Sequence, residues 1–426
     1  DQMPDQPRRC PVTGFDHHSA EHGDDPVAAY RRQRAQAPVA WTEAHGGYWV
    51  VSDWAGMEQV ATDDETFSSA RHPEAGGDGL SVLIPKSPVA PHIPIEVDPP
   101  EFQGYRRILM RFAKPSAIKE VQPMVERYAT AFVDSVIEAG ECDLADVVEL
   151  PAIVTVDWLG LDPREYPRYS SAMFAVIACH PDSDEYRHAA TVDIPEIEQQ
   201  VRAVIRARRA EPRDDVITGL AQAEIDGRLL SEDEVYSMAE LLISGGVGTT
   251  ASLIGQSLVW LAANPDERRR LIERPELLDG PALEELLRVF SPTQALARTV
   301  MSDTEIHGCP IPAGDRLLVS WASANRDPAR FPDPDRVDLE REPNRHAAFG
   351  VGVHRCAGLH LARAMSRTLI GQILERMPDY EVDLDRLERY PDQGVNVGWK
   401  TIPTTFTPGP RRGPTIQELL AATAPS

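Results

Sequence analysis

Residues 349–358 read Phe-Gly-Val-Gly-Val-His-Arg-Cys-Ala-Gly, and this loop says more about the chain than any other stretch. Its two glycines allow a tight turn that most residues could not make. His354 and Arg355 stand directly before Cys356, and the run 359–365 after it has helical spacing. A cysteine between basic neighbours at a helix N-terminus is expected to be a thiolate, because N–H groups and cations stabilise the negative sulfur.

Three kinds of site can be considered for such a cysteine. Zinc is disfavoured, because no second Cys or His stands at metal-site spacing from Cys356. A dinucleotide fingerprint begins with the right spacing at Gly350 and Gly352, but Arg355 replaces its third glycine. A lone buried thiolate suits one axial position of a haem iron, and this is the interpretation we favour.

The loop resembles the haem-binding signature of the cytochrome P450 family, F-x-x-G-x-x-x-C-x-G, and other family motifs extend the resemblance over about residues 25–408. The resemblance implies a mainly α fold with a small β-rich portion. We expect a flexible arm (1–25), a single P450 domain (26–408) and a C-terminal tail (409–426). Haem b is the implied cofactor, and its iron ligand is Cys356. The implied haem neighbours in this loop are Phe349, Gly350 and Gly358.

Composition and charge limit the partners and the compartment. The chain has 426 residues and a net charge of −24, which argues against nucleic acid as a partner. Its five cysteines follow no pairing pattern, so we expect a reducing compartment, the cytoplasm. No apolar run approaches the length of a membrane span, and the N-terminus is polar. The resemblance is therefore to the soluble bacterial type of P450, with no membrane partner.

The order of elements along the chain fits this interpretation. Residues 68–97 are rich in Pro, Gly and Ser, and such a loop covers the haem and lines the substrate cavity in P450s. Asp98-Pro99-Pro100 then opens a helix, and Pro181 to Asp184 interrupt two lid helices. Ser231 caps a long apolar helix that is expected to end near Ala263.

The long helix contains the glycine-rich run 244–250, although each helical glycine costs about 1 kcal/mol relative to alanine. The run resembles the oxygen-activation motif of P450s, which ends in an acid and a Thr. Thr249 matches the Thr and is expected to help deliver protons, and Gly245 is expected to approach the haem closely. Gly248 stands at the acid position and offers no carboxylate. This departure keeps open a haem-thiolate enzyme that catalyses peroxide-driven oxygenation, oxidative coupling or reduction.

Basic residues are expected around the haem and behind it. Glu285 and Arg288 match the family's E-x-x-R motif, whose role is structural, with Arg341 as the expected third member and Arg336 as the reserve. For the haem propionates the resemblance points to Arg106, Arg298 and His354. Phe102 replaces a frequent His partner, so Tyr105 is a further candidate.

The resemblance implies a monooxygenase that inserts one oxygen atom of O2 into a moderately apolar small molecule. No flavin or iron–sulfur motif is present, so the expected electron donors are a separate ferredoxin and its reductase. The expected docking patch for an acidic ferredoxin consists of Arg107, Arg111, Lys114, Arg355, Arg363 and Arg367. A haem-based sensor without turnover is the remaining alternative, but nothing resembles a signalling module.

Substrate contacts are carried over by position from the family. The expected walls are the 68–97 loop, the 170–200 lid and segments of the long helix and of later loops. The side chains expected to contact substrate are Leu241, Ser244, Gly245, Val247, Thr293, Gln294, Leu296, Val395 and Asn396. These are mostly apolar or small, so terpenoid, steroid, fatty-acid and macrolide substrates all remain open.

Overall fold

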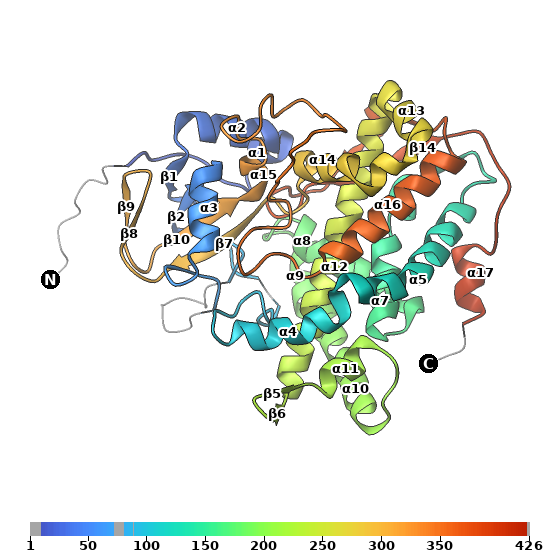
Figure 1. Ribbon diagram of the computed structural model, residues 1–426, viewed down its shortest axis with the longest axis horizontal. Coiled ribbons are helices and arrows are strands. Elements are labelled where there is room, and N and C mark those ends of the chain that lie inside the picture. Colours follow the sequence, from blue (N-terminus) through green and yellow to red (C-terminus); the bar gives the residue numbers. More distant parts are fainter. Residues whose placement is uncertain (1–9, 72–80, 88, 424–426) are drawn as a thin grey trace.

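The computed structural model describes residues 10–71, 81–87 and 89–423. A large helical part holds most of the chain, and a smaller part is built on a β-sheet (Figure 1). The longer helices of the helical part are α4 (Phe102–Ala113), α5 (Pro115–Asp134), α7 (Leu150–Leu159), α8 (Tyr166–Ala178), α10 (Ile194–Ala210), α12 (Glu232–Ala263), α13 (Pro265–Glu273), α14 (Pro281–Phe290) and α16 (Leu359–Arg376). The expectation of a mainly α fold with a small β-rich portion is confirmed.

The largest sheet has five strands in the order β1-β2-β10-β7-β3. Their bounds are Val39–Thr42, Tyr48–Val51, Arg316–Ser320, Ala295–Val300 and Phe67–Ser68. The pairing of β10 with β2 is parallel, and the other pairings are antiparallel. Every residue of β1 and β2 is buried, because helices α2 (Pro26–Gln36), α3 (Trp54–Thr62) and α15 (Trp321–Ala324) pack around this part.

Smaller elements complete the two parts. One three-stranded sheet has the order β11-β14-β4, over Glu381–Val382, Pro403–Thr405 and Glu141–Asp143. Three hairpins pair β5 (Glu224–Ile225) with β6 (Arg228–Leu229), β8 (Thr304–Ile306) with β9 (Cys309–Ile311), and β12 (Glu388–Arg389) with β13 (Trp399–Thr401). The short helices are α1 (Ala20–Asp24), α6 (Leu144–Val147), α9 (Asp184–His188), α11 (Val216–Ala221) and α17 (Ile416–Ala421).

Helix α12 forms the centre of the helical part, with α16 alongside it (Figure 1). It starts with a capping box: Glu234 N–H donates to the Ser231 hydroxyl, and Ser231 N–H donates to the Glu234 carboxylate. Within the described residues, α12 alone is long and apolar enough to cross a membrane, so the expectation that no segment reaches that length is wrong. More than half of its most apolar window is buried inside the protein, as in the core helix of a globular fold.

The segment expected to be an arm is packed in its described part. Thr13 N–H donates to the Trp41 carbonyl, which adds this segment to the edge of β1. Phe15, His17, His18 and His22 are all buried. Residues 1–9 lie outside the described residues, so a flexible arm is wrong for 10–25 and untested before them.

The structure also describes most of the loop expected over residues 68–97 and most of the C-terminal tail expected after residue 408. After β3, the described residues between 69 and 97 contain neither helix nor strand, as expected for a long loop, and Gly76, Gly77 and Pro88 lie outside them. The tail after 408 runs along α5 and ends in α17, whose Ile416 is buried in the main core. It is therefore joined to the domain by apolar packing.

Candidate active site

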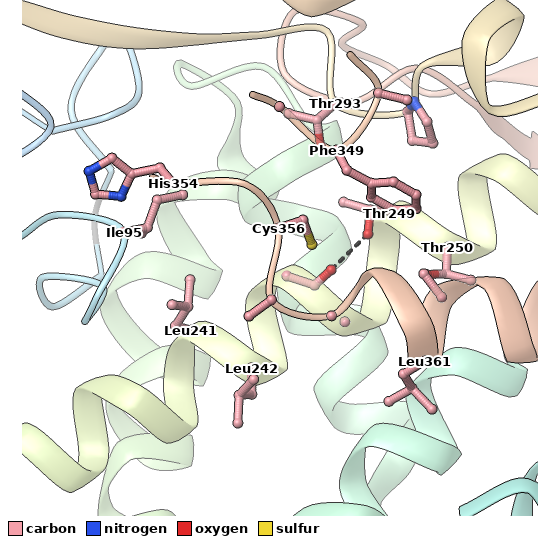
Figure 2. Close-up of a pocket in the computed structure, with 18 of the residues that line it drawn as sticks. Ile95, Leu241, Leu242, Thr249, Thr250, Thr293, Phe349, His354, Cys356 and Leu361 are labelled. Carbon is pink, nitrogen blue, oxygen red and sulfur yellow. Dashed lines mark hydrogen bonds between the residues drawn. The ribbon is translucent and has the colours of Figure 1, made fainter. Parts of the chain in front are cut away.

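A cavity of about 250 Å³ lies between α12 and the loop that carries Cys356. Figure 2 shows the Cys356 sulfur in this cavity, with Thr249, Leu241 and Leu242 of α12 around it. Of the residues expected near the haem, those that line the cavity are Arg106, Gly245, Thr249, Arg298, Phe349, Gly350, His354, Cys356 and Gly358. The fold thus brings together residues from four separate segments of the sequence.

The Cys356 loop is shaped by its backbone. Cys356 N–H donates to the Phe349 carbonyl at 2.8 Å and closes the turn. Gly352 has a φ of 78°, and a Cβ there would lie 2.1 Å from the Ala61 carbonyl oxygen. A side chain at this position would therefore push the loop away from α3, and helix α16 could not begin at Leu359 in the same place.

The Cys356 side chain is only partly exposed, and this affects the charge of its thiol. Burial raises the pKa of the thiol, while the Gly358 N–H and the cations of Arg106, Arg363 and Arg355 lower it less. The N–H group and the cations favour the expected thiolate, but the desolvation of the sulfur anion opposes it more strongly. A coordinating metal ion removes the thiol proton outright, so the thiolate forms with the iron.

Three residues expected to hold the haem propionates, Arg106, Arg298 and His354, line the cavity close to one another. Arg298 on β7 is buried, which lowers its pKa to about 10, and burial also lowers the pKa of Arg106 on α4. Within the described residues neither guanidinium has a carboxylate at ion-pair distance. Both ring nitrogens of His354 are buried without a hydrogen-bond partner, and burial lowers its pKa to about 3. A buried imidazole without a partner, beside two guanidinium groups without a carboxylate among the described residues, fits an anionic group bound between them.

Of the two aromatic residues Phe102 and Tyr105 on α4, only Phe102 lines the cavity. Phe102 packs edge-on against His354, with ring centroids 4.6 Å apart, and fixes the imidazole. Tyr105 does not line the cavity: its hydroxyl donates to Oε1 of Glu234 at 2.6 Å. The expectation of Tyr105 as a propionate partner is therefore wrong, because neighbouring helical residues point about 100° apart and Tyr105 faces the start of α12.

The glycine-rich run of α12 remains helical throughout. The Thr249 hydroxyl donates to the Gly245 carbonyl at 2.7 Å (Figure 2), which leaves its oxygen lone pairs toward the cavity. A Cβ at Gly246 would lie 2.8 Å from the Thr155 hydroxyl, so this glycine allows α7 to approach. A Cβ at Gly248 would meet only the Asn396 amide nitrogen, at 3.6 Å.

The residues expected to contact substrate divide into two groups. Leu241, Gly245, Thr293 and Leu296 line the cavity. The cavity lining does not include Ser244, Val247, Gln294, Val395 or Asn396. The reason lies in their packing: Val247 is in the core with α7 and α8, and the Gln294 amide donates to the Ser291 carbonyl. The 170–200 segment does not contribute to the cavity lining either.

The acid and base of the E-x-x-R motif are fully buried. Two nitrogens of Arg288 donate to the two Glu285 oxygens at 2.8 and 2.7 Å, and Nε of Arg341 donates to Oε1 at 3.1 Å. Asn344 donates to Oε2 at 3.0 Å. Among the described residues, the reserve candidate Arg336 takes part only through its carbonyl, which accepts from Arg288 and Arg341. Every oxygen of the buried carboxylate is therefore satisfied.

Several residues of the site were missed from the sequence. The cavity is also lined by Leu109, Trp158, Leu242, Leu253, Trp321 and Met365. Leu242 lies three residues before Gly245 and Leu253 lies four residues after Thr249, so helical spacing could have found both. Leu109, Trp158 and Trp321 come from distant elements and carry no local signal.

Comparison with known proteins identifies the family. The family profile described as Cytochrome P450 matches residues 280–404. A steroid C26-monooxygenase of Mycobacterium tuberculosis is 32% identical over 91% of this chain and 95% of its own length. The monooxygenase PikC of Streptomyces venezuelae is 30% identical over 91% and 93%.

Solved structures agree with this result. The structure of CYP109E1 from Bacillus megaterium in complex with testosterone superposes with a TM-score of 0.81. It is 26% identical and covers 91% of this chain and 99% of that one. The enclosed cysteine and the buried cations fit the haem that such proteins bind through an axial thiolate. The chain therefore belongs to the cytochrome P450 family: it is a haem-thiolate monooxygenase of the bacterial type, which acts with O2, an organic substrate and a redox partner.

Proposed function

We propose that this monooxygenase oxidises a moderately apolar molecule of steroid size. The observation that carries the proposal is the lining of the cavity beside Cys356. The surface that faces the cavity is mainly apolar, and Leu241, Leu242 and Leu296 contribute to it. Such a wall excludes water and binds a ligand mainly through buried apolar area, with a few polar groups for orientation. Thr293 is a candidate for one of those polar contacts.

The relatives support a steroid over the other classes that the sequence leaves open. The mycobacterial relative is named a steroid C26-monooxygenase, and CYP109E1 was solved with testosterone and with corticosterone. Other relatives bind different molecules, since a mutant of EryK was solved in complex with erythromycin B. We therefore place macrolides second for this chain.

The site residues have distinct proposed roles. Haem, when bound, supplies the activation of O2 at an iron held by a thiolate. Arg106, Arg298 and His354 hold the propionates by charge-assisted hydrogen bonds. Thr249 holds a proton donor at the cavity wall, and the apolar side chains keep bulk water away from it. Glu285, Arg288 and Arg341 keep the region behind the haem rigid.

We propose a separate ferredoxin with its reductase as the electron source, in the cytoplasm. Four cations of the expected patch are exposed and have no carboxylate at ion-pair distance in the described part of the chain: Arg107, Arg111, Lys114 and Arg355. Arg363 is engaged within the chain, because it donates to Glu284 at 2.7 and 2.9 Å, and Arg367 lies 3.7 Å from Asp279. The proposed docking patch is therefore reduced to the four exposed residues.

A spectral binding screen tests the substrate class. The haem protein is titrated with a steroid, a macrolide and a fatty acid, and the change of iron spin state is recorded. We expect saturable binding of the steroid and loss of most of that affinity in Leu296→Glu, which places a charge in the wall. Steroid binding that is absent while a macrolide or fatty acid binds would overturn the proposal.

Gly248 favours a second candidate, oxygenation driven by hydrogen peroxide. The acid position has no carboxylate, so delivery of protons to O2 along α12 lacks its usual donor. Turnover with peroxide is compared with turnover supported by a ferredoxin and its reductase, on the same substrate. Strong peroxide turnover without reductase-supported product would favour this second candidate.

A further inference from the structure

A polar cluster lies outside the haem cavity, where the N-terminal segment crosses the turn between β1 and β2. It consists of Asp16, His17 and His45, and one ligand-type atom of each lies within 4.8 Å of the others. Oδ1 of Asp16 accepts a hydrogen bond from Nε2 of His45 at 2.8 Å, and a bound ion would take the place of that proton between the two atoms. We propose that this Asp16–His45 cluster is a binding site for a divalent transition-metal ion. Two imidazoles and a carboxylate are a donor set that suits Zn²⁺, with water as a fourth ligand.

The His17 ring is held in the form that a metal ion needs. Its Nε2 lies 2.8 Å from the Ile84 carbonyl oxygen, which can only accept, so Nε2 carries the proton. Nδ1 is then the unprotonated nitrogen, and it accepts the Tyr48 hydroxyl at 2.9 Å. Metal-ligating histidines usually donate their other N–H to a carbonyl or carboxylate in this way. The ring is buried, so its orientation is fixed before any ion arrives.

The other two ligands leave the site open to solvent. The side chains of His45 and Asp16 are 22% and 31% exposed, which gives an ion and its water a path of entry. Asp16 is oriented by the His18 N–H, which donates to Oδ1 at 2.9 Å. His18 itself is fixed by the Asp392 carboxylate and by the Ile84 carbonyl, both at 2.9 Å. The cluster thus has the supporting contacts that position ligands in metal sites.

Binding must displace one competitor at His17. The Tyr48 hydroxyl donates to the same nitrogen that would bind the ion, and Tyr48 is fully buried. The ion therefore has to break a buried hydrogen bond before it can coordinate Nδ1. Removing the hydroxyl should make binding tighter, which separates coordination by His17 from loose adsorption on exposed carboxylates.

The test is a calorimetric titration of the dialysed haem protein with zinc chloride. We expect one saturable site per chain, and an affinity about tenfold or more weaker in His45→Asn. Asparagine suits this position because His45 has a φ of 51°, which Asn tolerates. The matched control is His307→Asn: His307 has a φ of 50° and pairs with Asp53 at 2.8 Å, but within the described residues it belongs to no such group of three. This control should bind zinc like the unmodified protein.

Tyr48→Phe completes the experiment and should bind zinc more tightly than the unmodified protein. Its fold is checked by the haem spectrum and by thermal unfolding without zinc, so that a change of affinity is not a change of structure. The proposal is overturned by the absence of a saturable site, by equal effects of His45→Asn and His307→Asn, or by weaker binding in a folded Tyr48→Phe. None of these readouts depends on substrate turnover.

Discussion

Nε2 of His92 lies 2.5 Å from Oε2 of Glu240, and both residues are buried. His92 belongs to the loop that also places Pro94 and Ile95 in the cavity wall, while Glu240 lies on α12. Ser244, one turn further along α12, has its hydroxyl 3.5 Å from the same nitrogen. This ion pair therefore ties the cavity loop to the helix that carries Thr249.

The pair predicts a stability that depends on pH. Burial lowers the pKa of His92, but the negative charge of Glu240 raises it, and the net direction is upward. A raised pKa means that the stabilisation is complete below about 6.5, the ordinary histidine value, and is lost as the pH rises through the higher folded value. We expect His92→Gln to lower the free energy of unfolding by about 3 kcal/mol below that pH, because it breaks a buried pair.

Urea unfolding of the two proteins at acidic and alkaline pH measures this difference. Glu240→Gln should show the same loss, and the double variant should lose little more than either single one. A difference between His92→Gln and the unmodified protein that stays constant with pH would contradict the assignment of the charged pair.

The local parts of the site could be predicted from the sequence, and the distant parts could not. Glu285 and Arg288 are three residues apart on one helix, so their pairing follows from helical geometry. His92 and Glu240 come from a loop and a helix, and no periodicity relates them. Tyr105 shows the limit within one helix: its neighbour Arg106 lines the cavity while Tyr105 faces Glu234. The register of a motif is visible in sequence, but the rotation of its helix is set by packing.

The prediction of a flexible N-terminal arm is wrong for residues 10–25 for a similar reason. Residues 10–25 are polar and rich in histidine, which is typical of an exposed arm. Two of the buried histidines in this segment find partners far along the chain: Tyr48 for His17 and Asp392 for His18. Burial of polar groups depends on partners that only the folded structure supplies.

Glu285→Gln should strongly destabilise the protein. The carboxylate is fully buried and accepts from two arginines, so its neutralisation leaves buried cations without a counter-charge. We expect a loss of about 3 kcal/mol or more in the free energy of unfolding. The Arg288 hydrogen bond is the main effect that lowers the pKa of Glu285 against its burial, so this stabilisation is lost as the pH falls below the ordinary value.

The control for Glu285→Gln is Asp266→Asn. Asp266 and Arg269 form a pair of the same spacing at 3.0 Å, but both side chains are mostly exposed. We expect this substitution to change stability by less than about 1 kcal/mol. Equal losses of unfolding free energy in the two variants would show that burial does not account for the stability contributed by the Glu285 network.

Cys356→Ser should remove the thiolate-type absorption band of the reduced carbon monoxide complex. Serine keeps the size of the side chain, so the loop should still close through the hydrogen bond to Phe349 and take up haem. The control is Cys309→Ser, at a buried cysteine of β9 outside the cavity, and it should keep the band. Loss of the band in the control alone would exclude Cys356 as the ligand.

Thr249→Val should increase the share of reducing equivalents lost as hydrogen peroxide. Valine keeps the shape of the side chain but removes the hydroxyl that donates to Gly245 and accepts toward the cavity. Loss of one group that positions protons usually costs between about 100-fold and 10,000-fold in the step it serves. Thr249→Ser keeps the hydroxyl and should stay close to the unmodified protein. Product and peroxide are measured together, and equal coupling in the valine and serine variants would reject a role for the hydroxyl.

The variant Gly248→Asp tests whether the missing carboxylate at this position limits proton delivery. The structure has room for it, since a Cβ at Gly248 would be in ordinary contact with the Asn396 amide nitrogen at 3.6 Å. That amide could donate to the new carboxylate and hold it near Thr249. We expect more product for each reducing equivalent and a smaller solvent isotope effect, because a carboxylic acid is a better proton donor than water.

Gly248→Asn is the matched control for this last variant, because it has nearly the same volume and cannot release a proton. If the asparagine variant improves coupling as much as the aspartate variant, the gain comes from filling space on α12. If neither changes coupling, protons reach Thr249 by another route, and the pair of His92 on the loop and Ser244 on α12 is the next candidate to test. Improvement in Gly248→Asp alone would show that the departure at Gly248 limits this chain as an O2-dependent enzyme.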